Sequence, residues 1–188
     1  MSEVYLISES FVRTMGSISD NTQGKFILPV IRESQEFDLQ PIIGSCLYRK
    51  LKELVANDEI GEAENAAYKD LLDVAQYLLL YGCLERLVLV TSAKISNAGA
   101  YQNQEQDMRP FSLNELFKLQ DSYRNKKDFF AKQVQRFCID NHKALPELKP
   151  CDCDAMRANL HSAASTGLWL GGMRGRYYRP ITDKYYKK

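Results

Sequence analysis

The residues best suited to bind a metal ion lie in one short stretch near the C-terminus. Cys138, His142, Cys151, Cys153 and His161 supply the thiolate sulfur and imidazole nitrogen that structural zinc sites use. A single residue separates Cys151 from Cys153, whereas about two to four separate the pair in a usual zinc knuckle. The alternative is a buried Cys138 followed by a turn over 150–154. Because the five cysteines form an odd set without a C-x-x-C pair, we predict free thiols and no bound metal or cofactor.

Catalytic groups are sparse elsewhere in the chain. His142 and His161 are the only histidines, and neither lies in a G-x-S-x-G or H-E-x-x-H context. The basic, glycine-rich stretch 171–175 follows no predicted strand and opens no predicted helix, so it does not meet the requirements of a phosphate-binding loop. Asp152 and Asp154 are typical turn residues. The sequence therefore predicts a protein that is not an enzyme.

The last fifteen residues form a basic, aromatic arm. Residues 174–188 carry a formal charge of +5, which leaves −4 on the remaining 173 residues. Such an arm can bind nucleic acid through phosphate contacts and base stacking. It can equally anchor to a protein, because Tyr, Trp and Arg are favoured at interfaces. We favour protein contact, since one short arm on an acidic body gives weak phosphate affinity. The residues predicted to make this contact are Arg174, Arg176, Tyr177, Tyr178, Arg179, Tyr185 and Tyr186, together with Trp169 just upstream of the arm.

Two long helices are predicted to form the framework that positions these candidate residues. Ser112 and Glu115 form a capping box, and apolar residues then recur every three or four positions, which predicts a helix over about 112–141. A second helix is predicted from about 64 to 96, ending at Asn97-Ala98-Gly99. Gly82 inside it indicates a kink or a close helix crossing.

Shorter elements precede and separate these helices. A helix is predicted over 21–36, where Pro29 kinks it or lies in its first turn. Asp38 is predicted to cap a segment over 39–43 that ends at Gly44, and Ser45 to cap a helix over 46–55. Residues 100–110 are polar and predict a protruding loop or small hairpin. We therefore predict an all-α helical bundle of about four to five helices over 1–148, with a protruding loop at 100–110 and an extended C-terminal arm over 149–188.

The sequence has no secretory signal pattern at its N-terminus, which predicts a cytoplasmic protein. Its most apolar window, 71–90, is interrupted by Asp73, Glu85 and Arg86. The longest uncharged run within that window, 74–84, is far shorter than the roughly 20 residues that span a bilayer. We interpret this window as a buried helix and predict no membrane partner.

Two short motifs lie along these helices. Residues 39–51 have the pattern L-Q-x-I-x-G-x-x-L-Y-x-x-L, and an N-x-G motif ends the long helix that follows. Together with the helix order over roughly 15–140, these motifs resemble the head-to-tail connector (adaptor) proteins of tailed bacteriophages. The ring proteins below the portal in crAss-like phages of gut Bacteroidetes are the most similar. The matching residues are Leu39, Gln40, Ile42, Gly44, Leu47, Tyr48, Leu51, Asn97 and Gly99.

The resemblance implies a structural virion protein at the portal-tail junction, assembled in the host cytoplasm. It implies a homo-oligomeric ring, a dodecamer, that docks on the portal protein, bridges it to other tail or ring proteins and lines the channel through which genomic DNA passes. It also implies that the loop after the long helix contacts the neighbouring subunit, through Tyr101, Gln104, Met108 and Arg109. The competing interpretation is a small nucleic-acid-binding protein that uses the basic arm.

Overall fold

The computed structural model describes residues 3–16, 18, 22–96, 99–102, 112–149 and 156–160. They form a helical bundle, which confirms the predicted all-α class. The helices are α1 (Glu9–Gly16), α2 (Gly24–Ser34), α3 (Gln40–Ala56), α4 (Ala66–Ser92) and α5 (Leu113–Asp140). One π-helical turn, η1 (Gln35–Leu39), joins α2 to α3, and two 3₁₀ turns, η2 (Ala63–Asn65) and η3 (Pro146–Leu148), lie further along the chain. The strands β1 (Ala93–Ser96) and β2 (Gly99–Gln102) form a small hairpin.

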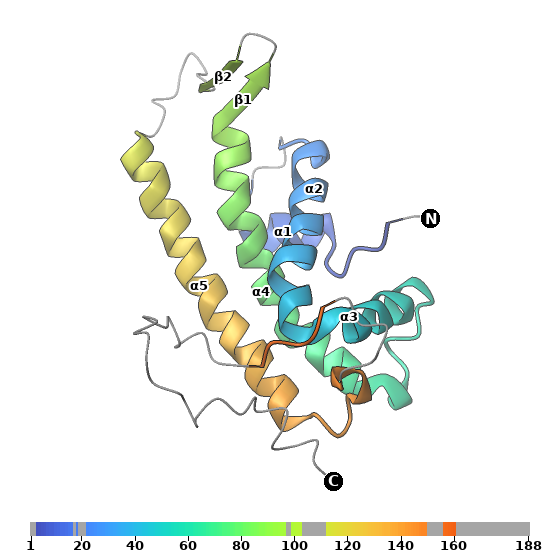
Figure 1. Cartoon of the computed structure of the whole chain (residues 1–188). Helices are drawn as coiled ribbons and strands as arrows, with labels where there is room; N and C mark the ends of the chain where they lie inside the picture. Colours follow the sequence, from blue (N-terminus) through green and yellow to red (C-terminus); the bar gives the residue numbers. More distant parts are fainter. Residues whose placement is uncertain are drawn as a thin grey trace, which may run out of the picture.

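Helix α4 is the centre of the bundle. It packs along α5 on one side and α2 on the other (Figure 1), and α1 lies behind it. Its buried residues surround the helix instead of forming one stripe; they include Tyr68, Leu71, Leu78, Leu79 and Leu84. By length and composition alone Ala63–Ser92 could cross a membrane. Because other helices pack on several of its sides, we assign α4 to the protein core.

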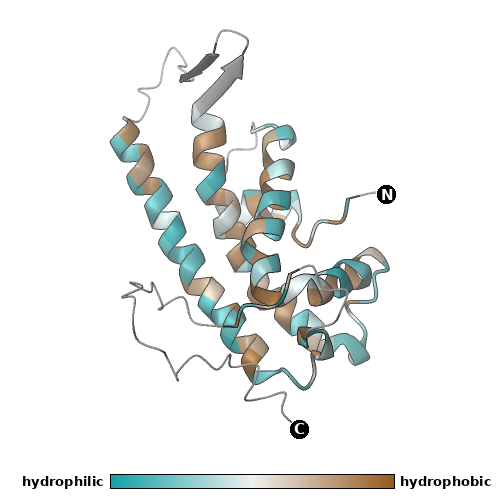
Figure 2. Cartoon of the chain, viewed as in Figure 1, coloured by the Kyte–Doolittle hydropathy of each residue, from teal (hydrophilic) through white to brown (hydrophobic). Residues whose placement is uncertain are grey.

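Helix α5 covers α4 along most of its length. It begins as predicted, because Ser112 Oγ accepts a hydrogen bond from the Glu115 amide while the Glu115 carboxylate accepts one from the Ser112 amide. Val134 and Cys138 face the core, whereas much of the visible surface of α5 is hydrophilic (Figure 2). The amphipathic pattern that predicted this helix therefore matches its packing.

The predicted end of the second long helix is wrong by four residues. Helix α4 ends at Ser92, and residues 93–96 form β1, which pairs antiparallel with β2. In the pairing register, Ala93 lies opposite Gln102 and Ser96 lies opposite Gly99. Pairing with β2 gives the backbone of residues 93–96 hydrogen-bond partners outside a helix, so the chain can leave α4 early. The hairpin projects beyond the ends of α4 and α5 (Figure 1).

The predicted cap at Asp38 is also wrong, because the chain is helical without a break from Gly24 to Ile43. Pro29 lies in the second turn of α2. The π turn over 35–39 turns Gln35 into the core, where its side-chain oxygen Oε1 accepts a hydrogen bond from the Leu6 amide at 2.6 Å. The break comes at Gly44, whose backbone has φ 81° and ψ 161°. Only glycine adopts this conformation readily, so Gly44 does separate two helical segments.

Candidate functional site

Four charged side chains meet where η1, α4 and α5 come together. Two nitrogens of Arg86 donate to the Asp38 carboxylate, with Nη1 at 2.6 Å from Oδ2 and Nη2 at 3.1 Å from Oδ1. Lys127 Nζ lies 2.6 Å from Glu85 Oε2 and 3.4 Å from Asp38 Oδ1. We call Asp38, Glu85, Arg86 and Lys127 the charged cluster. Its two acids and two bases balance, which offsets part of the free-energy cost of removing them from water.

Close packing of α2 against α4 holds the charged cluster in place. Ser34 Oγ lies 3.0 Å from the Asp38 carboxylate and 3.1 Å from the Leu79 carbonyl oxygen. A Cβ atom at position 82 would collide with the side chains of Ser34 and Asp38. Gly82 therefore marks a close helix crossing, one of the two alternatives that its position in the sequence indicated.

The electrostatics of the charged cluster favour the charged form of Arg86. Burial lowers the pKa of Arg86, but the hydrogen bonds and charge of Asp38 outweigh burial and raise the pKa above its usual value. On the outer side, Arg124 Nε donates to Glu85 Oε1 at 2.9 Å, and this hydrogen bond raises the pKa of Arg124. Every carboxylate of the cluster contacts a cation, so the arrangement is suited to joining three elements rigidly and not to proton transfer.

Sequence reasoning did not identify this cluster as a unit. It treated Asp38 as a helix cap and treated Glu85 and Arg86 only as interruptions of an apolar window. The sequence did carry one signal for it: Glu85 and Arg86 are adjacent charged residues inside the most apolar stretch of the chain. Charged residues are seldom buried unless they are paired, so this position predicts buried ion pairs. Lys127 carried no such signal, since lysines are common on helix surfaces.

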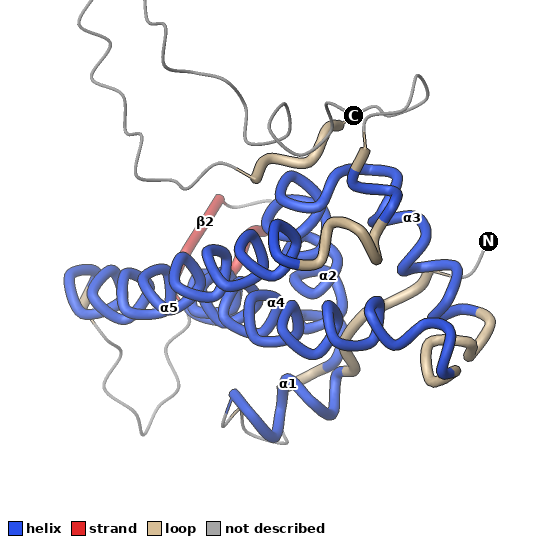
Figure 3. Tube along the Cα trace, turned by 90° about the horizontal axis from the view of Figure 1, so that it is seen from below, coloured by secondary structure: helices blue, strands red, loops and turns tan. Residues whose placement is uncertain are grey.

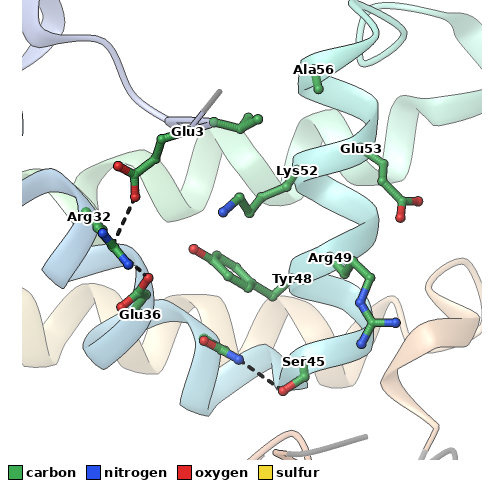
Figure 4. Close-up of a pocket in the computed structure, with 11 residues that line it drawn as sticks. Glu3, Arg32, Glu36, Ser45, Tyr48, Arg49, Lys52, Glu53 and Ala56 are labelled. Atoms are coloured by element: carbon green, nitrogen blue, oxygen red, sulfur yellow. Dashed lines mark hydrogen bonds and ion pairs between the residues drawn. The ribbon is translucent and has the colours of Figure 1, made fainter. Parts of the chain in front are cut away.

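A groove of about 900 Å³ opens between the N-terminal segment, α2 and α3 (Figure 4). Arg32 Nε lies 3.0 Å from both Glu3 and Glu36, and the Lys52 ammonium lies 5.3 Å from the centre of the Tyr48 ring. Burial raises the pKa of the Tyr48 hydroxyl. With acids and bases interleaved, this groove has no strong preference for an anion or a cation.

The hairpin end of the bundle exposes apolar side chains. Leu113 and Phe117 of α5 are 68% and 51% exposed, and Leu89 and Val90 near the end of α4 are 41% and 38% exposed. Figure 2 shows hydrophobic residues, in brown, among hydrophilic ones near both helix ends below the hairpin. We call these four residues the apolar tip. All four lie on the parts of α4 and α5 next to the hairpin, so this end of the bundle is suited to contact with another molecule.

The structure describes only some of the residues to which the sequence analysis assigned a functional role. Leu39 is buried on η1, and Ile42, Gly44, Leu47, Tyr48 and Leu51 are buried on α3. Tyr101 lies in β2 opposite Lys94, and Gly99 begins β2. Asn97, Gln104, Met108 and Arg109 lie outside the described residues, as do Trp169 and the whole basic arm.

The candidate zinc ligands are likewise only partly described. Cys151, Cys153 and His161 lie outside the described ranges, and within those ranges no three metal-binding side chains come together. Cys138 is fully buried on α5, and the His142 ring lies 2.9 Å from the Ile139 carbonyl oxygen. Burial raises the pKa of the Cys138 thiol to about 12, which disfavours the thiolate that a metal requires.

Burial predicts the reactivity of two cysteines. Because desolvation also raises the pKa of Cys83 to about 12, we expect neither Cys83 nor Cys138 to react with a thiol reagent at neutral pH in the native chain. Cys46, which is partly exposed, is the internal control and should react before either of them. Peptide mapping after timed labelling checks this expectation. Modification of Cys83 or Cys138 as fast as Cys46 would contradict the burial described here.

Comparison with known proteins gives one match. A model of DUF6712, described as a family of unknown function, matches residues 39–157. This region runs from the end of η1 through α3, α4, the hairpin and α5. Neither the curated proteins nor the solved structures contain a match to the chain.

Proposed function

We propose that this chain, which belongs to the DUF6712 family of unknown function, is the subunit of a head-to-tail connector ring in a tailed bacteriophage. In this proposal the ring docks on the portal protein, connects it to tail or other ring proteins and surrounds the path of the DNA. The resemblance of residues 39–51 and of the helix order to phage connectors motivates the proposal.

The hairpin end is the observation that carries the proposal. A hairpin projects past the ends of α4 and α5, and the apolar tip lies below it with its side chains in solvent. In a closed ring each subunit places one surface against a different surface of the next subunit. We assign the hairpin end to that contact, with a second copy of this chain as the occupant. Burial of the four apolar side chains would then stabilise the ring.

The charged cluster supports the same function. A ring under mechanical load during DNA passage requires subunits whose helices keep a fixed arrangement. The cluster ties η1, α4 and α5 together in the middle of the bundle. A force applied to the hairpin end is therefore carried into the bundle by helices that hold a fixed arrangement. The net charge of −4 outside the basic arm also limits retention of DNA along the channel.

The oligomeric state tests the proposal directly. We expect the full chain to form rings in mass photometry and negative-stain images, alone or when mixed with the portal protein of its own phage. The double variant Leu113→Ser, Phe117→Ser should lose ring formation and keep its helical content. Phe37→Ser is the matched control, because Phe37 is 65% exposed on η1, away from the hairpin. A monomer that remains indifferent to the portal would overturn the proposal.

The tyrosines of the basic arm provide a further prediction. Replacing Tyr177, Tyr178, Tyr185 and Tyr186 with serine should leave the thermal midpoint of the monomer within about 1 °C of the native value, since surface changes alter stability little. The same variant should weaken assembly on the portal, measured by co-sedimentation, because aromatic residues dominate interface energetics. Equal loss of monomer stability would place the arm in the core instead.

DNA binding is the outcome that favours the competing function. It would appear as micromolar or tighter affinity that falls steeply with salt and whose salt dependence weakens when Arg174, Arg176 and Arg179 become alanine. Such binding by a chain that forms no ring, with or without portal, would replace the connector proposal with a nucleic-acid-binding one.

A further inference from the structure

The helix break at Gly44 exposes backbone groups that another part of the chain uses. The Ser45 amide donates to the Met156 carbonyl oxygen at 2.8 Å, and the Asn159 amide donates to the Pro41 carbonyl oxygen at 3.1 Å. Residues 156–160 thus lie across the break as an extended segment, which we call the strap. In Figure 1 the strap crosses the front of the bundle, and Figure 3 shows it on the side opposite α1.

Side chains complete the contact between the strap and the bundle. Ser45 Oγ accepts a hydrogen bond from the Met156 amide at 3.1 Å, and Gln135 Nε2 of α5 donates to the Asn159 carbonyl oxygen at 3.2 Å. Leu160 is buried in the core cluster. Most of these bonds reach the strap backbone, so the break recognises an extended main chain more than particular side chains.

Gly44 is required for this contact on two grounds. Its φ of 81° opens the helix at the point where the strap binds. In addition, a Cβ atom on residue 44 would lie 2.8 Å from the Ala158 amide nitrogen and 3.2 Å from the Met156 carbonyl oxygen. The first distance is too short for a carbon atom and the second is tight, so a larger residue at position 44 pushes the strap away.

We propose that the break at Gly44 is a binding site for an extended peptide segment, occupied by residues 156–160, which anchors the beginning of the C-terminal arm (149–188) at the end of the bundle remote from the hairpin. Gln135, which holds the strap, follows Leu113 by 22 residues of α5, or roughly 33 Å at a rise of 1.5 Å per residue. The strap and the hairpin therefore lie far apart on the subunit. Under the proposed function, the hairpin contacts a neighbour in the same ring, and we assign the arm that follows the strap to a protein of an adjacent ring.

Hydrogen exchange on the full chain tests the anchor. In the native protein we expect the amides of Ser45, Met156 and Asn159 to be protected together. Gly44→Ala should accelerate exchange over 156–160 roughly tenfold or more, because the strap opens locally. Gly61→Ala is the matched control, since nothing lies near the added Cβ and no strain arises. Rapid exchange of the strap in the native protein would overturn the proposal.

A second variant keeps the test decisive if Gly44→Ala does not fold. Leu160→Asp leaves the helix break intact and removes the apolar contact of the strap. It should release 156–160 to fast exchange while residues 116–134 of α5 stay protected. Unchanged protection of the strap in Leu160→Asp would refute the anchor.

Photo-crosslinking locates the beginning of the C-terminal arm. With benzoylphenylalanine at position 162, we expect crosslinks to the C-terminal half of α5 or to α3 and none to 113–120. Crosslinks chiefly to 113–120 would overturn the placement. Both experiments use the free chain, so they succeed or fail independently of ring formation. A protected strap in a chain that never forms rings would leave the anchor standing and remove the connector function.

Discussion

Asp38→Ala is expected to destabilise the protein by about 3 to 5 kcal/mol, because it leaves Arg86 and Lys127 inside the bundle without their shared carboxylate. Asp38 is only 9% exposed and contacts both cations, with Arg86 Nη1 at 2.6 Å. Ser34 Oγ also loses one of its two acceptors. Urea denaturation followed by circular dichroism measures this loss of stability. We expect a lower midpoint urea concentration and an unchanged dependence of the unfolding free energy on urea concentration.

The control for this variant is a carboxylate on the surface. Asp140 lies 3.9 Å from Arg136, and the two side chains are 66% and 80% exposed. Asp140→Ala should change stability by no more than about 0.5 kcal/mol, since water and salt screen exposed pairs. If Asp38→Ala were as mild as Asp140→Ala, the charged cluster would not join the three elements as described.

Leu79→Ala is expected to cost about 2 to 5 kcal/mol, the range for removing a leucine from a core that cannot collapse around the cavity. Leu79 is fully buried in the middle of α4, with α2 and α5 on either side. At about 3 °C per kcal/mol for a chain of this size, the thermal midpoint should fall by roughly 6 to 15 °C. Differential scanning calorimetry gives this shift directly.

Leu72 provides a matched control on the same helix. It is only partly buried and packs at the margin of the core, so Leu72→Ala should cost about 1 kcal/mol. The two variants remove the same atoms from one helix and differ in burial alone. Equal effects would mean that α4 does not run through the centre of the bundle.

The long helices could be predicted from the sequence because their signals are local. The capping box at Ser112 and the spacing of apolar residues after it determine where α5 begins and which face it buries. The apolar window likewise identified α4. Its end could not be predicted in the same way, because residues 93–96 leave the helix through pairing with 99–102. Strand pairing depends on two segments at once, and helix propensity does not report it.

The candidate site was less predictable, for a similar reason. Asp38, Arg86 and Lys127 are distant in sequence and meet only after α4 and α5 pack. Asp38 after a helical stretch looks like a cap, and the π turn over 35–39 that instead directs it toward Arg86 has no local signature. Gly44 was predicted to end a helical segment, yet its second purpose, making room for the strap, depends on residues more than a hundred positions later.

The central position of α4 has a consequence for synthesis on the ribosome. Residues 66–92 emerge from the ribosome before α5, the helix that covers them, has been made. At roughly 5 to 20 residues per second, the next 48 residues take about 2 to 10 seconds. During that interval the face of α4 that packs on α5 stays uncovered. We therefore expect slower translation over 93–140 to lengthen this exposure and to increase aggregation of the nascent chain.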